Sequence, residues 1–474
     1  MELKTLSSGA KLCSISLFSG GGIGDIALEW GFKIPVIVKC EILEERASLL
    51  RSNYPESKVF QGDIWDLKSE ITNHVKTTLH KSRPWLIVSS PPCQGMSTNG
   101  AGRILKAIED GKRSEHDERN RLIIPSIDII EELSPDWFIF ENVPTMENTV
   151  ISNENNLPEN IMSILKRRLG SEYTIKASVL NFSNYGVPQN RKRLITIGCR
   201  IKKIKQMDAN PNQIFTKKPS FLHPLPNTSN KITLRQTIGH LEKLDSKHKL
   251  FSLKEPLHRI PKLSDDPYWW ITNTPENESA FNNLTCLNCN TSHIRPETKE
   301  LDLLLVKCTK CNENLSRPTT YERGWICSIC STINKKYTRK CINLHQRNKA
   351  KLETIRRLVK GFDTSYRRMT WDLPAKTITQ NSGTYSSDGK GHPEQNRVLS
   401  ILEILLIQTV HSSSKVKVRW NGRYKFEFLS ESNTFFTPTK SLDSIIRDVI
   451  GESIPPLGMQ RIIEHLQQLE KKHC

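Results

Sequence analysis

The sequence predicts an α/β fold built on a largely parallel sheet, and three observations support this. Short apolar runs alternate with amphipathic stretches over the first 200 residues, which is typical of strands joined by helices. A glycine-rich turn follows the first apolar run. Polar or reactive residues stand where several later runs end, and the carboxyl ends of parallel strands are where such sheets bind ligands.

Each element of this fold is predicted from a local pattern. Strands are expected at Leu12–Phe18, Pro35–Cys40, Lys58–Phe60, Trp85–Ser89, Trp137–Phe140, Tyr173–Leu180 and Leu194–Gly198. Helices are expected at Ile23–Trp30, Glu44–Asn53 and Leu122–Leu133. The last two strands are joined by about a dozen residues, too few for a helical crossover, so they are predicted to be antiparallel.

Changes in composition and in hydrophobic periodicity predict three regions along the chain. Residues 1–200 form the sheet domain, and residues 201–365 are richer in Lys, Pro, Asn and Ser with little periodicity. Residues 366–474 regain order, with helical runs at Val398–Val410 and Gln460–Leu469. The sequence therefore predicts a sheet domain, a less regular middle region and an ordered C-terminal region.

The composition indicates which classes of binding partner and which cellular compartment to expect. The net charge of +19 favours a polyanion such as nucleic acid, although a generally Lys-rich composition would give the same excess. No apolar stretch is long enough to span a membrane, and Met1–Lys11 lacks a signal-peptide core, so we expect an intracellular protein. Twelve cysteines in such a chain favour metal binding or catalysis over disulfides.

The glycine-rich turn Ser19–Asp25 and two carboxylates predict a cofactor site. Glycines let the backbone approach a ligand closely, and the free N–H groups of the following helix face the same place. Glu41 ends the next strand, about 20 residues after Gly20, where a carboxylate accepts ribose hydroxyls. Asp63 follows the third strand and could meet an adenine amino group. No Gly-Lys-Ser/Thr follows the turn, so an adenosyl cofactor without a triphosphate is favoured over ordinary strand-end turns.

The segment Ser89–Ser97 places one thiol, Cys93, after a buried strand and two prolines. Each proline fixes φ near about −65° and makes the turn stiff. A stiff turn suits a nucleophile, because covalent attack needs a preset geometry. Taken alone, an incidental buried thiol in a proline-rich turn is an equal alternative.

Glu141 and two arginines complete the candidate catalytic group. Glu141 ends the strand at Trp137–Phe140 and, in a parallel sheet, could share a pocket with Cys93. A thiolate beside a carboxyl group suits attack on an electron-poor heteroaromatic ring; an exposed strand-end carboxylate is the alternative. Arg191 and Arg193 lie in the tight link between the last two strands, where they could grip a phosphate or a carbonyl oxygen, or form a solvated basic turn.

Paired cysteines predict two structural zinc sites in an insert at about 284–346. The candidate ligands are Cys286, Cys289, Cys308, Cys311, Cys327, Cys330, Cys341 and His345. Two sets of four at these spacings fit one Cys₄ and one Cys₃His site, and which pairs share a metal stays open. The insert is basic, so it could touch nucleic-acid phosphates or only brace its domain. The preceding aromatic cluster, Asp266–Trp270, is expected to be core.

These motifs, in this order, resemble one family, the DNA cytosine-5 methyltransferases. Leu17–Gly22 is similar to its cofactor motif, Pro91–Gly95 to its nucleophile loop, and Glu141–Val143 to its acid motif. Gln189–Arg193 resembles its arginine motif, and Arg367–Thr379 the segment that leaves its target-recognition region.

The resemblance implies an S-adenosylmethionine-dependent methyltransferase with a Rossmann-like sheet and a smaller target-recognition domain at 201–365. It also implies that residues 366–474 return to the catalytic domain. A cytosine is flipped from the duplex, Cys93 adds to C6, Glu141 stabilises N3, and C5 takes the methyl group of S-adenosylmethionine. Arg193 would hold the cytosine O2, and Arg191 would support the loop or a phosphate. The implied cofactor-binding residues are Phe18, Gly20, Gly22, Glu41, Asp63, Ile64, Pro91 and Glu452.

The chain departs from the family in two places. Glu452 stands where the last motif usually has an asparagine, which changes the contact with the methionine end of the cofactor. Val410–His411 replaces the usual Phe-Pro.

The predicted protein is a monomeric bacterial DNA methyltransferase of the cytoplasm and nucleoid that acts on double-stranded DNA. By family analogy it would be paired with a restriction endonuclease. A tRNA cytosine-5 methyltransferase and a non-catalytic, zinc-dependent DNA-binding protein are the alternatives.

Overall fold

The computed structural model describes residues 3–92, 118–280, 365–387, 389–413, 415–420, 426–428 and 442–473, with four two-residue strands between 285 and 356. Contacts divide the chain into two compact units. The first comprises Met1–His240, Asp372–Gln380 and Ile401–Cys474, and the second Leu241–Trp371 and Asn381–Ser400.

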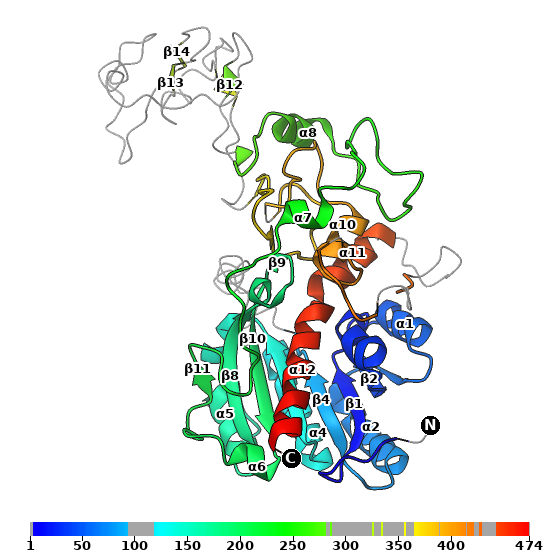
Figure 1. Cartoon of the computed structure of the whole chain (residues 1–474), viewed down its shortest axis with the longest axis vertical. Coiled ribbons are helices and arrows are strands. Elements are labelled where there is room, and N and C mark those ends of the chain that lie inside the picture. Colours follow the sequence, from blue (N-terminus) through cyan, green and yellow to red (C-terminus); the bar gives the residue numbers. More distant parts are fainter. Residues whose placement is uncertain are drawn as a thin grey trace. The chain divides into compact units, whose positions relative to one another are not determined.

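The first unit is built on one eight-stranded sheet (Figure 1), ordered β11-β8-β10-β5-β4-β1-β2-β3. Its strands are β1 (Lys11–Leu17), β2 (Val36–Glu41), β3 (Lys58–Gln61), β4 (Pro84–Ser89), β5 (Trp137–Asn142), β8 (Thr174–Asn181), β10 (Lys192–Cys199) and β11 (Phe215–Thr216). All seven predicted strands are confirmed to within a few residues at their ends.

The sheet is parallel except for β10, which is antiparallel to both neighbours. This confirms the predicted antiparallel pairing of the last two long strands, β8 and β10. Every residue of β4 and β5 is buried, because helices cover both faces of the parallel part, and both strands therefore read as unbroken apolar runs. The predicted α/β sheet is therefore present, but it is mixed and not wholly parallel.

Helices of the first unit flank the sheet. They are η1 (Ile23–Asp25), η2 (Ala27–Phe32), α1 (Glu44–Asn53), α2 (Ile64–Thr78), η3 (Glu118–Leu122), α4 (Ile123–Leu133), η4 (Pro144–Asn148), α5 (Ile161–Leu169), η5 (Phe182–Tyr185), α6 (Lys202–Lys205), α7 (Leu234–Ile238), α10 (Ile401–Ile407), α11 (Leu442–Glu452) and α12 (Pro456–His473). Apolar residues of α2, α4 and α5 share one core with the sheet. The long helix α12 runs along the opposite side of the sheet in Figure 1.

The predicted helix at Ile23–Trp30 is not regular. The chain forms a 3-10 turn, η1, and then a π-helical stretch, η2. Gly24 lies in η1 and Gly31 in η2, and glycine disfavours a regular helix through its larger backbone entropy. Helices α1 and α4 agree with their predictions to within a residue.

A carboxylate fastens α12 to the sheet. Both indole nitrogens of Trp85 and Trp137 donate to Glu470 Oε1, which lies near the end of that helix. These tryptophans begin β4 and β5 and are fully buried. The bonds satisfy two N–H groups that would otherwise be buried without partners.

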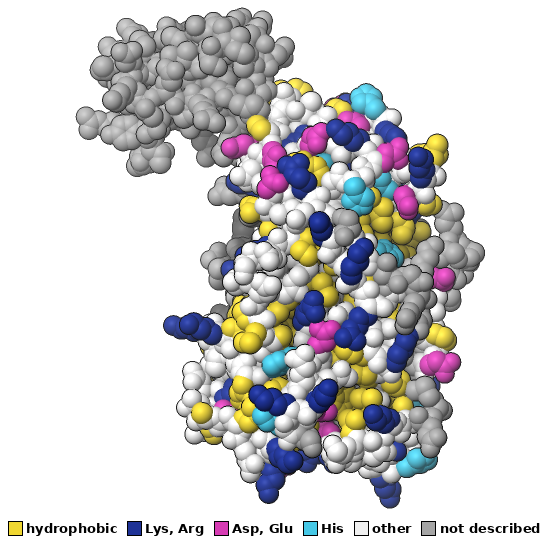
Figure 2. All heavy atoms as spheres, in the orientation of Figure 1, with side chains coloured by type: hydrophobic (Ala, Val, Ile, Leu, Met, Phe, Trp, Pro, Cys, Tyr) yellow, Lys and Arg dark blue, Asp and Glu magenta, His cyan; other side chains and the backbone are white. Residues whose placement is uncertain are grey.

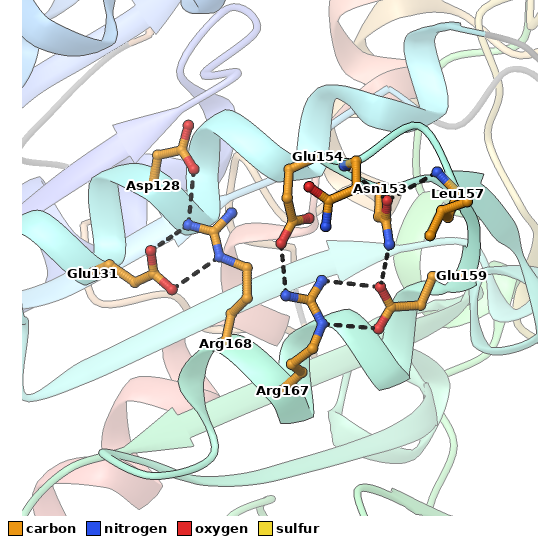
Figure 3. Close-up of polar contacts among 9 residues, drawn as sticks. Asp128, Glu131, Asn153, Glu154, Leu157, Glu159, Arg167 and Arg168 are labelled. Atoms are coloured by element: carbon orange, nitrogen blue, oxygen red, sulfur yellow. Dashed lines mark hydrogen bonds and ion pairs between the residues drawn. The ribbon is translucent and has the colours of Figure 1, made fainter.

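A short hairpin, β6 (Val150–Ser152) and β7 (Pro158–Asn160), follows η4 and is tied to α5. Figure 3 shows Arg167 of α5 between Glu154 and Glu159, at 2.6 and 2.9 Å. The neighbouring Arg168 pairs with Asp128 and Glu131 of α4 in the same view. These ion pairs link α4, the β6–β7 hairpin and α5.

The units have different boundaries from the predicted regions 1–200, 201–365 and 366–474. The first unit extends to His240 because α7 packs against α10. It also takes back 372–380, where β16 (Ala375–Lys376) pairs in parallel with β9 (Gln189–Asn190). Residues 381–400 belong to the second unit.

The second unit has a small core around α8 (Asp265–Thr272). Trp270 and Ile271 are buried there with Leu263, Ala280, Tyr385 and Val398. Of the predicted aromatic cluster, Trp270 is core, and the partly buried Tyr268 and Trp269 pack against that core. Buried Arg368 donates to five acceptors of this unit, four of them backbone carbonyls. Four short strands lie between 285 and 356: β12 (Thr285–Cys286), β13 (Trp325–Ile326), β14 (Ile333–Asn334) and β15 (Ile355–Arg356).

The visible face of the first unit carries many cationic side chains (Figure 2). Figure 2 shows Lys and Arg side chains scattered over its visible face, with apolar side chains between them. Among the described residues, no helix combines the length and apolarity that crossing a bilayer requires.

Candidate active site

The candidate site forms where four parallel strands of the first unit end. Leu17 of β1 pairs with Cys40 of β2 and with Ser89 of β4, and Ser89 pairs with Phe140 of β5. The glycine-rich turn, Glu41, the Pro91–Pro92 segment and Glu141 follow directly from these positions. The register therefore brings the predicted cofactor and catalytic residues to one edge of the sheet.

The glycine-rich turn is clasped by Glu41. One carboxylate oxygen accepts the Gly20 N–H at 2.8 Å and the other accepts the Leu43 N–H at 3.0 Å. Gly20 and Gly22 have φ of +55° and +81°, a region that suits glycine, and Phe18 has φ of +56°. A Cβ built on Gly20 would meet no atom within 4 Å, so the turn borders open space at this residue.

Asp63 stands at the beginning of α2 and acts as its N-cap. Its Oδ1 accepts the Trp65 N–H at 2.9 Å. The carboxylate is exposed, and its second oxygen makes no hydrogen bond to the described part of the chain. Ile64, the next residue, is buried as the first residue of the helix.

The chain leading to Cys93 is held at two points. The Ser90 N–H donates to the Leu17 carbonyl at 3.2 Å, and the Pro91 carbonyl accepts the Asn142 amide at 3.1 Å. Pro91 is buried, whereas Cys93 itself lies outside the described residues. The structure therefore fixes the backbone two residues before the predicted nucleophile.

Glu141 and Arg193 form a buried ion pair. Arg193 Nε lies 2.8 Å from Glu141 Oε1, and only 9% of the Glu141 side chain is exposed. The two atoms are close without the geometry of a hydrogen bond, and Oε1 has no hydrogen-bond partner among the described residues. Because Ile195 of β10 pairs with Glu141, Arg193 lies diagonally across the ladder from it.

Arg191 serves a different purpose from its neighbour. Its side chain is fully buried and donates to the carbonyls of Ile378, Gly451 and Glu452 at 2.9 to 3.2 Å. It ties the β8–β10 connection to the returning segment and to the end of α11. Of the two roles implied for Arg191, support of the loop fits this burial, and contact with a phosphate does not.

Glu452 is engaged at the end of α11. Its carboxylate lies 2.6 Å from Arg46 of α1 and also accepts from Gln380. Partial burial raises the pKa of Glu452, Arg46 opposes this, and the negative charge of Glu41 reinforces it. Val449 of the same helix would be only 2.3 Å from a Cβ on Gly21, so α11 packs directly on the glycine-rich turn.

Several residues of the site had no role assigned from sequence. Asn142 lies within the acid motif, but its bond to Pro91 is visible only in the structure. Gln189 bonds Gln408 and the Ile378 N–H behind the arginine motif. Lys39, a buried residue of β2, could have been singled out from the sequence, because a charged residue in an otherwise apolar strand needs a buried partner.

The predicted zinc ligands Cys289, Cys308, Cys311, Cys327, Cys330, Cys341 and His345 lie outside the described residues, as does the side chain of Cys286. The described part of the chain contains no group of three residues able to hold a metal. Cys13, Cys40 and Cys199 are buried there and form no disulfide in the described part of the chain. Burial raises the pKa of Cys13 and Cys40 to about 12, which makes both unreactive.

Comparison with known proteins gives concordant matches. A family model described as C-5 cytosine-specific DNA methylase matches residues 12–468. Type II methyltransferase M1.HgaI of Avibacterium volantium is 28% identical over 465 residues, which cover 96% of this chain and 98% of that protein. Type II methyltransferase M.AquIA of a Picosynechococcus species is 32% identical over 201 residues, covering 40% of this chain and 73% of that protein. Among solved structures, a DNA modification methyltransferase encoded within an E. coli prophage aligns with 97% of this chain and 99% of that chain, at a TM-score of 0.49 and 18% identity.

Proposed function

Because this chain belongs to the C-5 cytosine-specific DNA methylase family, we propose that Cys93, Glu141 and Arg193 carry out its methyl transfer to C5 of a cytosine in duplex DNA. The observation that supports this assignment is the buried Glu141–Arg193 pair, at the edge where Asn142 holds Pro91. In this pair a buried carboxylate oxygen, Glu141 Oε1, has no hydrogen bond among the described residues and lies 2.8 Å from a guanidinium with donors to spare.

Each residue has a distinct task in this reaction. The target base is extruded from the duplex, and the Cys93 thiolate forms a bond to C6. Glu141 shares a proton with ring N3, which stabilises the electron density that moves to C5. After C5 has gained the methyl group and lost its proton to a base, the C6–sulfur bond breaks and the thiolate leaves. Arg193 binds the cytosine O2 and keeps Glu141 in place.

S-adenosylmethionine is the methyl donor that the family implies, and when bound it supplies an electrophilic methyl group. The donor set fits its adenosine part. Glu41 keeps one acceptor direction on each oxygen beyond its bonds to Gly20 and Leu43, enough for two ribose hydroxyls. Asp63 offers its second oxygen to an amino group, and Phe18, Gly20, Gly22, Ile64 and Pro91 line the same edge.

We place the methionine end of the cofactor near Glu452. Its carboxylate attracts an ammonium group, and Arg46 beside it attracts a carboxylate. The test compares Glu452→Gln with the unaltered enzyme by calorimetry, using S-adenosylhomocysteine and 5′-methylthioadenosine, which lacks the amino-acid end. Affinity should fall for the first ligand only. An equal fall for both, or none, would refute this placement.

Mapping the modified base tests the reaction itself. Random duplex DNA is incubated with the enzyme and S-adenosylmethionine, and modified positions are sequenced. We expect 5-methylcytosine within one short site, and no methylation by Cys93→Ser. An N-methylated base, or modification of tRNA alone, would contradict the proposal. DNA binding without methylation would favour the non-catalytic alternative.

The biological setting follows from the relatives. We propose that the enzyme is a bacterial, cytoplasmic monomer that protects host DNA at the sites of a companion restriction endonuclease. DNA methylated in vitro should then resist an endonuclease of the same specificity. Cleavage of fully methylated DNA by that endonuclease would exclude the pairing.

We also propose two structural zinc ions in the insert at about 284–346. The support is the donor set itself, seven cysteines and one histidine in closely spaced pairs. Elemental analysis should find two zinc ions per chain, and fewer after Cys341→Ser. Cys199→Ser is the matched control, since Cys199 is a buried cysteine outside the pairs. Active protein without zinc would refute this part.

A further inference from the structure

A buried ionic cluster lies behind the glycine-rich turn. Lys39, in the middle of β2, is fully buried, and its Nζ is 2.9 Å from Asp25 and 3.5 Å from Glu29. The same ammonium group stands 4.0 Å from the centre of the Tyr54 ring. Removing a lysine ammonium group from water costs free energy, so packing alone does not explain why a cluster of this kind is buried here.

Tyr54 connects this cluster to the turn. The residue closes α1, only 3% of it is exposed, and its hydroxyl donates to the Gly22 carbonyl at 2.6 Å. The ring packs so closely that a Cβ on Gly22 would lie 2.5 Å from Tyr54 Cε2. Burial raises the pKa of Tyr54, so the phenol remains a hydrogen-bond donor.

Asp25 holds the turn from its other end. Its backbone N–H donates to the same Gly22 carbonyl at 3.1 Å, while its carboxylate binds Lys39. The Gly22 carbonyl is therefore fixed by two donors, and both belong to residues that contact Lys39.

The turn needs such support because of its backbone conformation. Phe18, Gly20 and Gly22 all have positive φ within five residues. A non-glycine residue in this region costs free energy, so the conformation persists only where its surroundings hold it. Glu41 holds the Gly20 N–H from the ligand side, and Tyr54 holds Gly22 from the opposite side.

We propose that Tyr54 and Lys39 are positioning residues that hold the glycine-rich turn in its cofactor-binding conformation. They act through Gly22 and Asp25 and do not touch the cofactor. The inference rests on the proposed function, since it takes the turn to be the S-adenosylmethionine site. If part of the molecules lost this conformation, the apparent affinity would fall by the fraction that remains competent.

Tyr54→Phe tests the proposal by removing one oxygen atom. The loss of one buried hydrogen bond should weaken S-adenosylmethionine binding by about two- to tenfold. KM for the cofactor should rise by the same factor, whereas kcat at saturating cofactor should stay within about twofold. Calorimetry on the full chain measures the affinity, and initial rates measure the two kinetic constants.

Tyr173→Phe is the matched control. Tyr173 is also buried, and its hydroxyl also donates to a backbone carbonyl, that of Pro135 at 2.9 Å, away from the turn. Its removal should lower the melting temperature but leave cofactor affinity unchanged. If Tyr54→Phe lowers stability alone, as the control does, the inference is wrong.

A second variant covers the case in which Tyr54→Phe does not fold. Asp25→Asn keeps the backbone bond to Gly22 and weakens only the contact with Lys39. It should show the same rise in KM with little change in kcat, and unchanged cofactor affinity would overturn the inference. If the unaltered enzyme binds no S-adenosylmethionine, the proposed function fails with it. If that enzyme binds normally and the variants match it, the inference fails alone.

Discussion

Replacing Asn142 by alanine should slow catalysis without weakening cofactor binding. The Asn142 amide donates to the Pro91 carbonyl at 3.1 Å, and its oxygen accepts the Val143 N–H at 2.8 Å. The side chain is almost fully buried, so alanine leaves the Pro91 carbonyl without this donor. Pro91 stands two residues before Cys93 in the sequence, so a shift of Pro91 should move the proposed nucleophile.

The magnitude follows from the cost of the lost bond. A buried acceptor left without its donor costs about 1–3 kcal/mol. If all of this cost falls on the productive position of Cys93, the rate of methyl transfer drops by about 5- to 150-fold. Affinity for S-adenosylmethionine should stay within about twofold, because the bonds to the glycine-rich turn and Glu41 are unchanged and Pro91 is the one proposed cofactor residue that loses a bond.

Single-turnover methylation of duplex DNA is the assay, and Asn160→Ala is the control. Asn160 also donates to a backbone carbonyl, that of Glu147 at 3.0 Å, and accepts a backbone N–H, that of Met162 at 2.8 Å. It lies in the β6–β7 hairpin, so its loss should leave the rate unchanged. An unchanged rate in Asn142→Ala, or an equal fall in both variants, would refute the reasoning.

Three further predictions concern stability. Burial lowers the pKa of His223 to about 4, below the ordinary value of a histidine. As the pH drops, the unfolded chain therefore binds a proton at this residue before the folded protein does, and stability falls between about pH 6.5 and pH 4. The loss should approach roughly 3 kcal/mol in urea unfolding, and His223→Gln should flatten the pH dependence. Glu470→Leu leaves the Trp85 and Trp137 indoles without their acceptor and should lower the free energy of unfolding by roughly 2–6 kcal/mol. Glu470→Gln keeps an acceptor oxygen and should lower it by about 1 kcal/mol. Equal losses in the two variants would show that these hydrogen bonds do not contribute to stability. Arg167→Ala should cost about 1 kcal/mol or less in the same assay, since its side chain is nearly half exposed, and a larger loss would mark the network in Figure 3 as more than a surface feature.

The strands were predictable because their signal is local. Trp85–Ser89 and Trp137–Phe140 are apolar runs ended by proline or polar residues, and each is a buried strand. The antiparallel direction of β10 could be predicted because the connection between β8 and β10 is too short for a helical crossover. Helices α2 and α5 were not predicted, although both are amphipathic and less polar than α1, so the sequence carried a usable signal for them.

What could not be predicted depends on partners far away in sequence. Arg191 resembles a solvated basic residue, yet it is buried against carbonyls from residues 187 and 260 positions away. Tyr54 gave no signal, because its task depends on a glycine carbonyl 32 positions earlier. The eight candidate zinc ligands stay a prediction from spacing alone.

The most direct test of the central claim is a covalent trap. Duplex DNA that carries 5-fluorocytosine at the target position is incubated with the enzyme and S-adenosylmethionine. Fluorine cannot leave as the C5 proton does, so the base should remain bonded to the protein, and mass spectrometry should locate the bond on Cys93. A bond at another residue, or methylation of ordinary DNA without any trapped complex, would contradict the assignment of the nucleophile.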